Sequence, residues 1–166
     1  MGRNLLLLAC FYLYSGISNA NERVGNWLYQ VKGENFEIFT ANESSSLFGF
    51  ICKSNDCYFY IHAGSNCRPE AEVAVLVNFD SGADISYAKC HHFQRKTGTI
   101  PILKMTDKFL FDGMKSASVV SFGIALEQGQ FKISKFSLEG FEDARALLVK
   151  QLSEGTDALG DPKNNL

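Results

Sequence analysis

The stretch FGFICKSNDCYFYI, residues 48–61, decides the fold expected for this chain. Two short aromatic and β-branched runs flank the polar residues 53–56, which is the pattern of two strands joined by a turn. In this hairpin Cys52 and Cys57 face each other across the loop. Directly opposed residues of an antiparallel pair bring their Cβ atoms to roughly 4.5–5.5 Å, somewhat beyond the roughly 3.5–4.5 Å of a disulfide. The sequence therefore predicts a hairpin that a local disulfide can bridge.

Beyond an N-terminal leader the chain has four cysteines, Cys52, Cys57, Cys67 and Cys90. An even number of cysteines behind a signal peptide favours an oxidising compartment and two disulfides. A Cys52–Cys57 bridge leaves Cys67 to pair with Cys90, but four cysteines allow three pairings and the sequence does not choose among them. We therefore expect all four to be disulfide-bonded, with the connectivity open.

Residues 1–20 have the features of a secretory signal peptide. Arg3 precedes an apolar run over residues 5–13, and a small-x-small cleavage site ends at Ala20. The run is too short for a stable membrane anchor. We expect cleavage after Ala20, no integral membrane segment in the mature chain, and a periplasmic or secreted location. The alternative is a lipoprotein anchored at Cys10, which the apolar residues after Cys10 disfavour.

The charge balance argues against a nucleic-acid binder. The whole chain has 16 basic and 18 acidic side chains, and residues 1–20 contain Arg3 but no acidic residue. The mature chain therefore has 15 basic and 18 acidic side chains, a formal net charge of −3. A nucleic-acid-binding protein should show a basic stripe, so no nucleic-acid partner is expected. The remaining length suits a single domain over residues 21–153.

Short β-prone runs recur along the whole domain. Besides the hairpin they cover residues 26–32, 36–41, 72–79, 84–89, 99–104, 108–111, 119–126 and 131–136. The run 72–79 is apolar on both of its faces, which is typical of a central strand covered on both sides. Trp27, in the first run, is expected to anchor the core. Eight to ten short strands at this spacing predict an all-β fold, an antiparallel β-sandwich or a partly open barrel.

The hydrophobic period changes at residue 141. Apolar residues then recur at spacings of three and four, at Phe141, Ala144, Leu147, Leu148 and Leu152. Acidic residues open this segment and a basic residue closes it, each at the favourable end of a helix dipole. The pattern predicts one C-terminal amphipathic helix over residues 141–153, packed on the sheet. Residues 154–166 have little to bury and are expected to form a flexible tail.

Catalytic residues and cofactors are not expected. The sequence has no Gly-x-Ser-x-Gly elbow, and disulfide-bonded cysteines leave no thiol for a Cys–His enzyme. The candidate metal ligands are Cys90, His91 and His92, with His62 as a third imidazole, since thiolates and imidazoles bind zinc or copper. A disulfide-bonded Cys90 has no thiolate to give. Adjacent residues of a strand point to opposite faces, so His91 and His92 cannot both reach one ion there. No metal site is therefore expected, and a metal carrier using these three histidines remains a second alternative function.

Aromatic residues that alternate with core positions suggest a contact surface. Tyr58 and Tyr60 alternate with Phe59, which places them on the outer face of the hairpin unless a loop or the helix covers them. Exposed aromatics can mark a protein contact. With Arg68 and Pro69 of the following loop they form the predicted partner surface. The same loop is the candidate for an inhibitory loop that enters the cleft of a lysozyme or protease.

The segment 131–144 carries a family resemblance. A strand that runs into Ser-Leu-x-Gly-Phe-x-x-Ala, residues 137–144, resembles the invasion-associated locus B family of bacterial secreted proteins. The early Trp27, the cysteine-containing middle and the terminal helix are also similar to that family. The resemblance implies a β-sandwich of the bacterial periplasm or envelope, linked in some members to host-cell entry and without agreed catalytic residues.

Together these observations predict a non-enzymatic periplasmic or secreted protein that binds a protein or envelope partner, with a role in virulence or invasion. The first alternative is a proteinaceous inhibitor of a lytic enzyme. The second is the metal carrier described above.

Overall fold

The structure is a computed structural model that describes residues 22–53, 56–95, 98–125 and 130–158. The expected signal peptide, residues 1–20, lies outside the described residues, as does the part of the expected tail from residue 159 onward.

Ten strands form one antiparallel sheet in the order β1-β2-β3-β4-β5-β8-β7-β6-β9-β10. The strands are β1 (Glu22–Val24), β2 (Trp27–Lys32), β3 (Asn35–Ala41), β4 (Leu47–Lys53), β5 (Asp56–His62), β6 (Glu72–Phe79), β7 (Gly82–Arg95), β8 (Gly98–Met105), β9 (Val119–Ala125) and β10 (Phe131–Ser137). Helix α1 (Lys108–Met114) lies between β8 and β9, and helix α2 (Phe141–Ala158) follows β10.

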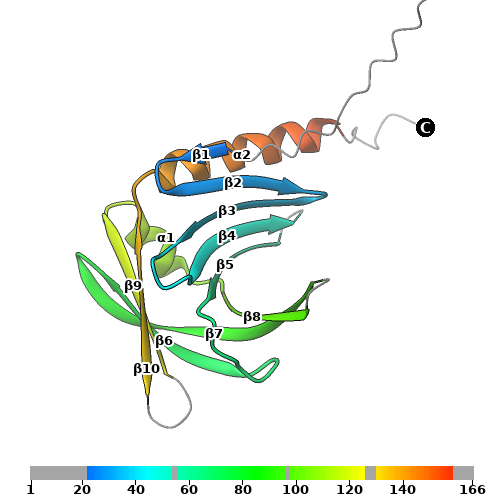
Figure 1. The fold of residues 1–166 in the computed structure, drawn as a ribbon. Coiled ribbons are helices and arrows are strands. Elements are labelled where there is room, and N and C mark those ends of the chain that lie inside the picture. Colours follow the sequence, from blue (N-terminus) through cyan, green and yellow to red (C-terminus); the bar gives the residue numbers. More distant parts are fainter. Residues whose placement is uncertain (1–21, 54–55, 96–97, 126–129, 159–166) are drawn as a thin grey trace, which may run out of the picture.

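The sheet curls into a half-barrel, with α2 lying along the strands β1 and β2 (Figure 1). Although β3 and β10 are far apart in the strand order, they contact each other, and Ser134 Oγ on β10 lies 3.2 Å from Ser46 Oγ just before β4. The predicted all-β antiparallel fold with a C-terminal helix is therefore confirmed. Its two halves stay hydrogen-bonded through β5 and β8, so the strands form one curled sheet, as in a partly open barrel.

The hairpin expected over residues 48–61 forms β4 and β5. Cys52 pairs directly with Cys57, and Phe50 pairs with Phe59. Because side chains alternate along a strand, this register sends Phe48, Phe50 and Phe59 to the concave face, where each is buried. The alternation of the sequence thus sets both the register and the buried face.

An aromatic cluster fills the inside of the curl. The ring of Phe48 lies 5.7 Å from that of Trp27, 4.8 Å from that of Phe122 and 5.6 Å from that of Phe136. Trp27 also contacts Phe141 of α2, with 5.0 Å between ring centroids. These rings come from β2, β4, β9, β10 and α2, so one cluster joins both ends of the sheet to the helix. Trp27 is fully buried, which confirms it as a core anchor.

Helix α2 buries the face that its period predicts. Phe141, Ala144 and Leu148 are buried and pack in the core, with Leu147 and Leu152 partly buried beside them. The helix runs to Ala158, five residues beyond the expected end at residue 153. The apolar positions stop at Leu152, so the hydrophobic pattern contains no signal for these last residues.

Helix α2 is positioned by a close contact between two turns. The backbone N–H of Asn26 donates to the carbonyl of Glu139 over 3.1 Å. A Cβ atom added to Gly140 would lie 2.3 Å from the carbonyl oxygen of Val24, and Gly140 has a φ of +85°. Both the close approach and the left-handed backbone require glycine here. This gives a physical reason for the glycine in the segment 137–144.

Helix α1 corrects one expectation, a strand over residues 108–111. The side chain of Asp107 accepts a hydrogen bond from the backbone N–H of Phe109 over 3.1 Å, which caps a helix in place of a strand. Leu110 and Met114, four residues apart, are both buried. The run is so short that its apolar residues fit a strand and a helix equally well, and the cap decides between them.

Candidate functional site

The two tyrosines of the predicted partner surface are largely covered. Tyr60 is 7% exposed; its ring lies over Gly49 of β4, and its hydroxyl donates to Glu37 Oε1. Tyr58 is half-buried, with the Lys104 ammonium 3.9 Å from its ring centroid. Burial, and then the nearby carboxylates of Asp56 and Glu37, raise the pKa of the Tyr58 phenol. The outer face of β5 therefore presents little free aromatic surface.

Arg68 and Pro69 lie elsewhere, on the connection from β5 to β6, and both are exposed. This connection is attached to β7 at several points. Cys67 is disulfide-bonded to Cys90, the backbone N–H of Glu70 donates to the carbonyl of Cys90 over 2.9 Å, and that of Cys90 donates to the carbonyl of Ala71 over 2.8 Å. The four predicted surface residues thus belong to two separate elements.

The three histidines of the metal-carrier alternative have separate partners. His62 Nδ1 lies 2.8 Å from the carbonyl oxygen of Pro101. On β7, His91 lies 3.8 Å from the carboxylate of Glu70, whereas the next residue, His92, has Nε2 2.9 Å from the carbonyl oxygen of Cys67. The alternation along the strand separates His91 from His92, as predicted. The structure does not bring the three imidazoles together.

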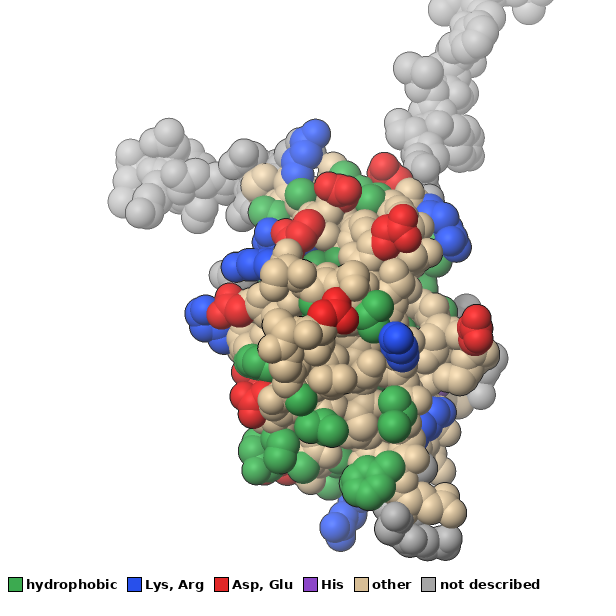
Figure 2. Space-filling view, turned by 90° about the vertical axis from the view of Figure 1, so that its left-hand side faces the viewer, with side chains coloured by type: hydrophobic (Ala, Val, Ile, Leu, Met, Phe, Trp, Pro, Cys, Tyr) green, Lys and Arg blue, Asp and Glu red, His purple; other side chains and the backbone are tan. Residues whose placement is uncertain are grey.

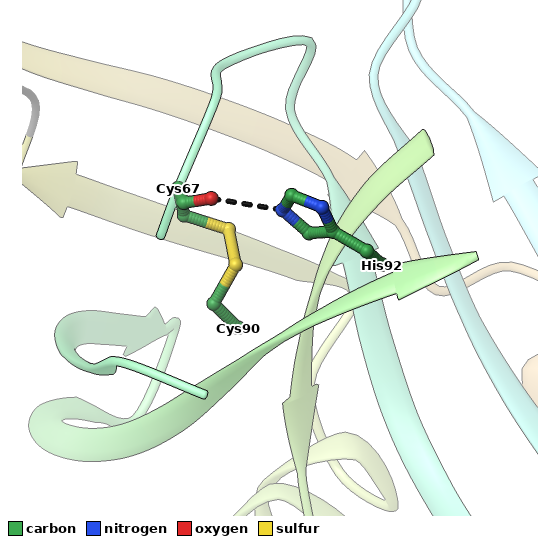
Figure 3. A group of neighbouring side chains, drawn as sticks. All are labelled: Cys67, Cys90 and His92. Carbon is green, nitrogen blue, oxygen red and sulfur yellow. Dashed lines mark hydrogen bonds between the residues drawn. A yellow bond between two sulfur atoms is a disulfide. The ribbon is translucent and has the colours of Figure 1, made fainter. Parts of the chain in front are cut away.

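The structure instead places His92 beside the second disulfide (Figure 3). Cys52 pairs with Cys57 and Cys67 pairs with Cys90. Cys90 and His92 are two residues apart on β7 and share its inner face, where Cys90 is fully buried. One ligand atom from each of Cys67, Cys90 and His92 lies within 4.8 Å of the other two. We call these three residues the Cys–Cys–His cluster.

A second feature is a group of large apolar side chains on the convex face of β6, β7 and β10, here called the apolar face. Its members are Leu76, Ile85, Tyr87, Phe131 and Ile133, and their exposed fractions range from 49% to 73%. Figure 2 looks onto the side where β9, β10 and the β6–β7 turn lie in Figure 1, and shows hydrophobic side chains gathered in its lower half.

The strand register places these residues in one row that runs across the sheet and in two pairs beside it. Ile85 pairs with Leu76, Leu76 with Gly123, and Gly123 with Ile133. Beside this row Tyr87 pairs with Ala74 on β6, and Phe131 of β10 pairs with Ala125 of β9. Directly paired residues lie on the same side of a sheet. The row therefore places Ile85, Leu76 and Ile133 on one side of the sheet across four strands, about 14 Å at the usual strand spacing, with Gly123 between Leu76 and Ile133.

Polar residues border the apolar face at both ends of the strands. Beyond Tyr87 lie Lys89 and its paired residue Glu72 on β6; beyond Ile133 lies Lys135, and Asn78 lies beyond Leu76. All four are exposed. An apolar centre depleted of charge and a polar border of both signs are typical of protein interfaces.

A groove of about 670 Å³ adjoins the apolar face where β10 approaches β2 and β3. Its lining includes Ile133 and Lys135 of β10, Leu28 of β2 and Asn42 after β3. The groove is the seam left where the curled sheet does not close by hydrogen bonding. Ile133 thus belongs to the apolar face and also lines the groove.

Sequence reasoning missed the apolar face because it expected β6 to be covered on both sides. Val75 and Val77 are fully buried on the concave side, but Leu76 on the other side is 49% exposed. The sequence contained a usable signal. Both β6 and β10 have apolar residues on two faces, while the predicted fold has one long helix to cover them.

The comparisons with known proteins support the fold. No family model and no curated protein sequence matches the chain. Among solved structures, the crystal structure of invasion associated protein B from Bartonella henselae is similar, with a TM-score of 0.55 and 11% sequence identity. The match covers 81% of this chain and 99% of that protein. The similarity shows a shared fold.

Among the described residues, the helices are too short or too polar to cross a membrane.

Proposed function

We propose that this chain is a non-enzymatic binding protein of the bacterial periplasm, envelope or extracellular space, which holds a protein partner on its apolar face. The observation that supports the proposal most directly is the exposure of five large apolar side chains on one side of β6, β7 and β10. Soluble monomers rarely expose contiguous apolar patches of this kind without a binding role.

The location rests on three supports. Residues 1–20 read as a signal peptide. Two disulfides, Cys52–Cys57 and Cys67–Cys90, suit an oxidising compartment. The structural neighbour is an invasion associated protein of a bacterium. The most specific part of the proposal is a role in host-cell invasion. It is supported by that neighbour's name and by the resemblance over residues 137–144.

The shape and charge of the surface favour a protein as the partner. A small-molecule site is usually concave, whereas the apolar face covers the convex side of the sheet. An anionic membrane or a nucleic acid would select clustered basic residues, but Lys89 is paired with Glu70 at 2.8 Å and lies opposite Glu72. In the groove beside Ile133, a side chain of the partner could be anchored, as interface hot spots often are.

Site-specific photocrosslinking in intact producing cells tests the proposal. A photoreactive residue is placed at Ile85 or Ile133 of the full chain and, as the matched control, at Asp143, an exposed residue of α2. We expect a discrete heteromeric adduct from both apolar positions, none from Asp143, and loss of the adduct when Leu76→Asp is added.

Three results would overturn the proposal. One is the absence of an adduct from Ile85 and Ile133. Another is an equal adduct from Asp143, which would show non-specific contact. The third is an adduct of twice the chain's mass, which would show that a second copy covers the apolar face.

A further inference from the structure

We propose that reduction of the Cys67–Cys90 disulfide turns the Cys–Cys–His cluster into a binding site for a divalent metal ion of the zinc type. In the oxidised chain both sulfurs are bonded to each other, 2.02 Å apart, and neither is a thiolate. Metal ligation requires thiolates and a neutral imidazole. The site is therefore gated by the redox state, a property independent of the apolar face.

The cluster reaches the dimensions of a metal site once its two sulfurs separate. Its three ligand atoms lie within 4.8 Å of one another. A tetrahedral zinc ion with Zn–S distances of about 2.3 Å and Zn–N distances of about 2.0 Å separates its ligand atoms by roughly 3.5–3.8 Å. The Cα atoms of Cys67 and Cys90 are 6.0 Å apart, so separating the sulfurs requires side-chain rotation more than movement of the chain.

The backbone holds two of the ligands on one rigid element. Cys90 and His92 lie on the inner face of β7, which is paired with β6 on one side and β8 on the other. Cys67 comes from the connection before β6, and residues 70–71 of that connection remain hydrogen-bonded to Cys90 without the disulfide. Reduction therefore leaves the third ligand tethered beside the other two.

The imidazole of His92 faces the sulfurs through a specific ring nitrogen. A carbonyl oxygen can only accept, so His92 Nε2 donates its hydrogen to the carbonyl of Cys67 at 2.9 Å. This hydrogen bond holds the ring beside the disulfide (Figure 3). On metal binding, Nε2 exchanges this hydrogen bond for the metal ion, and the ring proton moves to Nδ1.

The surroundings leave room for a fourth ligand. A cavity of about 40 Å³ adjoins Cys67, and its lining includes Ser65, Asn66, Ile61 and Leu103. This volume is sufficient for one water molecule. Three protein ligands with an open fourth position form an accepted zinc arrangement.

The redox step balances without involving the metal. An external dithiol transfers two electrons and two protons to the disulfide, which becomes two thiols while the dithiol becomes a disulfide. Binding of the ion then releases the two thiol protons, and the metal keeps its oxidation state. Reoxidation of Cys67 and Cys90 by an acceptor of two electrons, such as another protein disulfide, forms the bridge again and expels the ion.

The other disulfide provides a matched control within the same chain. Cys52–Cys57 lies at the end of a hairpin, and among the described residues it belongs to no such cluster. The test titrates Co²⁺, a spectroscopic substitute for Zn²⁺, into the mature protein before and after reduction with a phosphine, with far-UV circular dichroism recorded alongside. The variants are Cys52→Ser/Cys57→Ser, Cys67→Ser/Cys90→Ser and His92→Gln, whose amide can keep the hydrogen bond to Cys67.

We expect one tetrahedral Co²⁺ per chain, with thiolate-to-metal charge-transfer absorption, in reduced wild type and in reduced Cys52→Ser/Cys57→Ser. The oxidised protein and Cys67→Ser/Cys90→Ser should not bind. His92→Gln should weaken binding by at least about tenfold, since even the loss of an outer partner of a ligand typically costs that much. Equal binding by His92→Gln, binding that depends on Cys52 and Cys57, or loss of the β-sheet spectrum on reduction would each overturn the proposal.

Discussion

Replacing Gly140 by alanine should destabilise the protein far more than a glycine-to-alanine change usually does. The added Cβ atom meets the carbonyl oxygen of Val24 at 2.3 Å and the backbone of Gly25 at 3.0 Å, and the φ of +85° is unfavourable for any L-residue. Both neighbours are backbone atoms, so no flexible side chain can move aside. The contact between the β1–β2 turn and the start of α2 must open instead.

The magnitude follows from two terms. A left-handed backbone costs an alanine roughly 1–2 kcal/mol. Overpacking in a closely packed site adds about 1–3 kcal/mol. Gly140→Ala should therefore lower the free energy of unfolding by about 2–5 kcal/mol, a large share of the roughly 5–15 kcal/mol that stabilises a domain.

Gly33→Ala is the matched control. Gly33 also has a positive φ, +62°, but a Cβ atom there would have no neighbour within 4 Å. This variant measures the backbone term alone, and we expect a loss of about 1–2 kcal/mol. Equilibrium urea unfolding of the oxidised proteins gives both values through the transition midpoint at constant slope. Equal losses in the two variants would refute the argument that the turn-to-turn contact positions α2.

Three further predictions concern the disulfides, the core and the pH dependence. Loop entropy predicts that Cys67→Ser/Cys90→Ser, which removes a bridge with a sequence separation of 23, lowers the free energy of unfolding in guanidinium by about 3 kcal/mol. Cys52→Ser/Cys57→Ser, which removes a bridge with a separation of 5, should lower it by about 2 kcal/mol. The reverse order would contradict the loop-entropy argument. Phe48→Ala removes ring contacts to Trp27, Phe122 and Phe136 and should lower the free energy of unfolding in urea by about 3–5 kcal/mol. A decrease below about 1 kcal/mol would show that the aromatic cluster does not hold the sheet closed. The Ser118 hydroxyl and backbone N–H lower the pKa of Asp80 below its ordinary 3.8. The stability that the Asp80 carboxylate contributes is therefore present above pH 3.8 and is lost as the pH falls through the lowered pKa. Melting temperatures of Asp80→Asn should fall less than those of wild type over this acidic range, and an unchanged acid profile would contradict the assignment.

The elements that sequence reasoning predicted correctly are those whose signal is local. In the hairpin, the alternation around Cys52 and Cys57 sets the register, and the turn residues between them set the direction. In α2, the spacing from Phe141 to Leu152 identifies the buried face without knowledge of what covers it. Both depend on side-chain periodicity within about a dozen residues.

What the sequence did not predict depends on distant parts of the chain. The run over residues 108–111 fits a strand until the cap at Asp107 is recognised. The exposure of Leu76 and Ile133 depends on which side of the curled sheet α2 covers, and α2 contacts β1, β2 and β3 at the opposite end of the strand order. Periodicity shows that a face is apolar but not whether another element reaches it.

The Cys–Cys–His cluster depends both on a local pattern and on distant parts of the chain. The shared face of Cys90 and His92 follows from their spacing of two on a strand. Cys67 joins them only because the connection before β6 returns alongside β7, which no local pattern indicates. The burial of Tyr60 was not predicted for a similar reason: it depends on Gly49 of the neighbouring strand, which leaves room for the tyrosine ring.

The contact between Trp27 and Phe141 also limits when the protein can fold. These rings lie 5.0 Å apart in space, yet a ribosome adds more than a hundred residues between them. Until α2 is available, Trp27 lacks one of the rings that it contacts in the core. The hairpins can form early, but the core closes only after the segment that contains Phe141 has been synthesised, because contacts between residues far apart in the sequence form late.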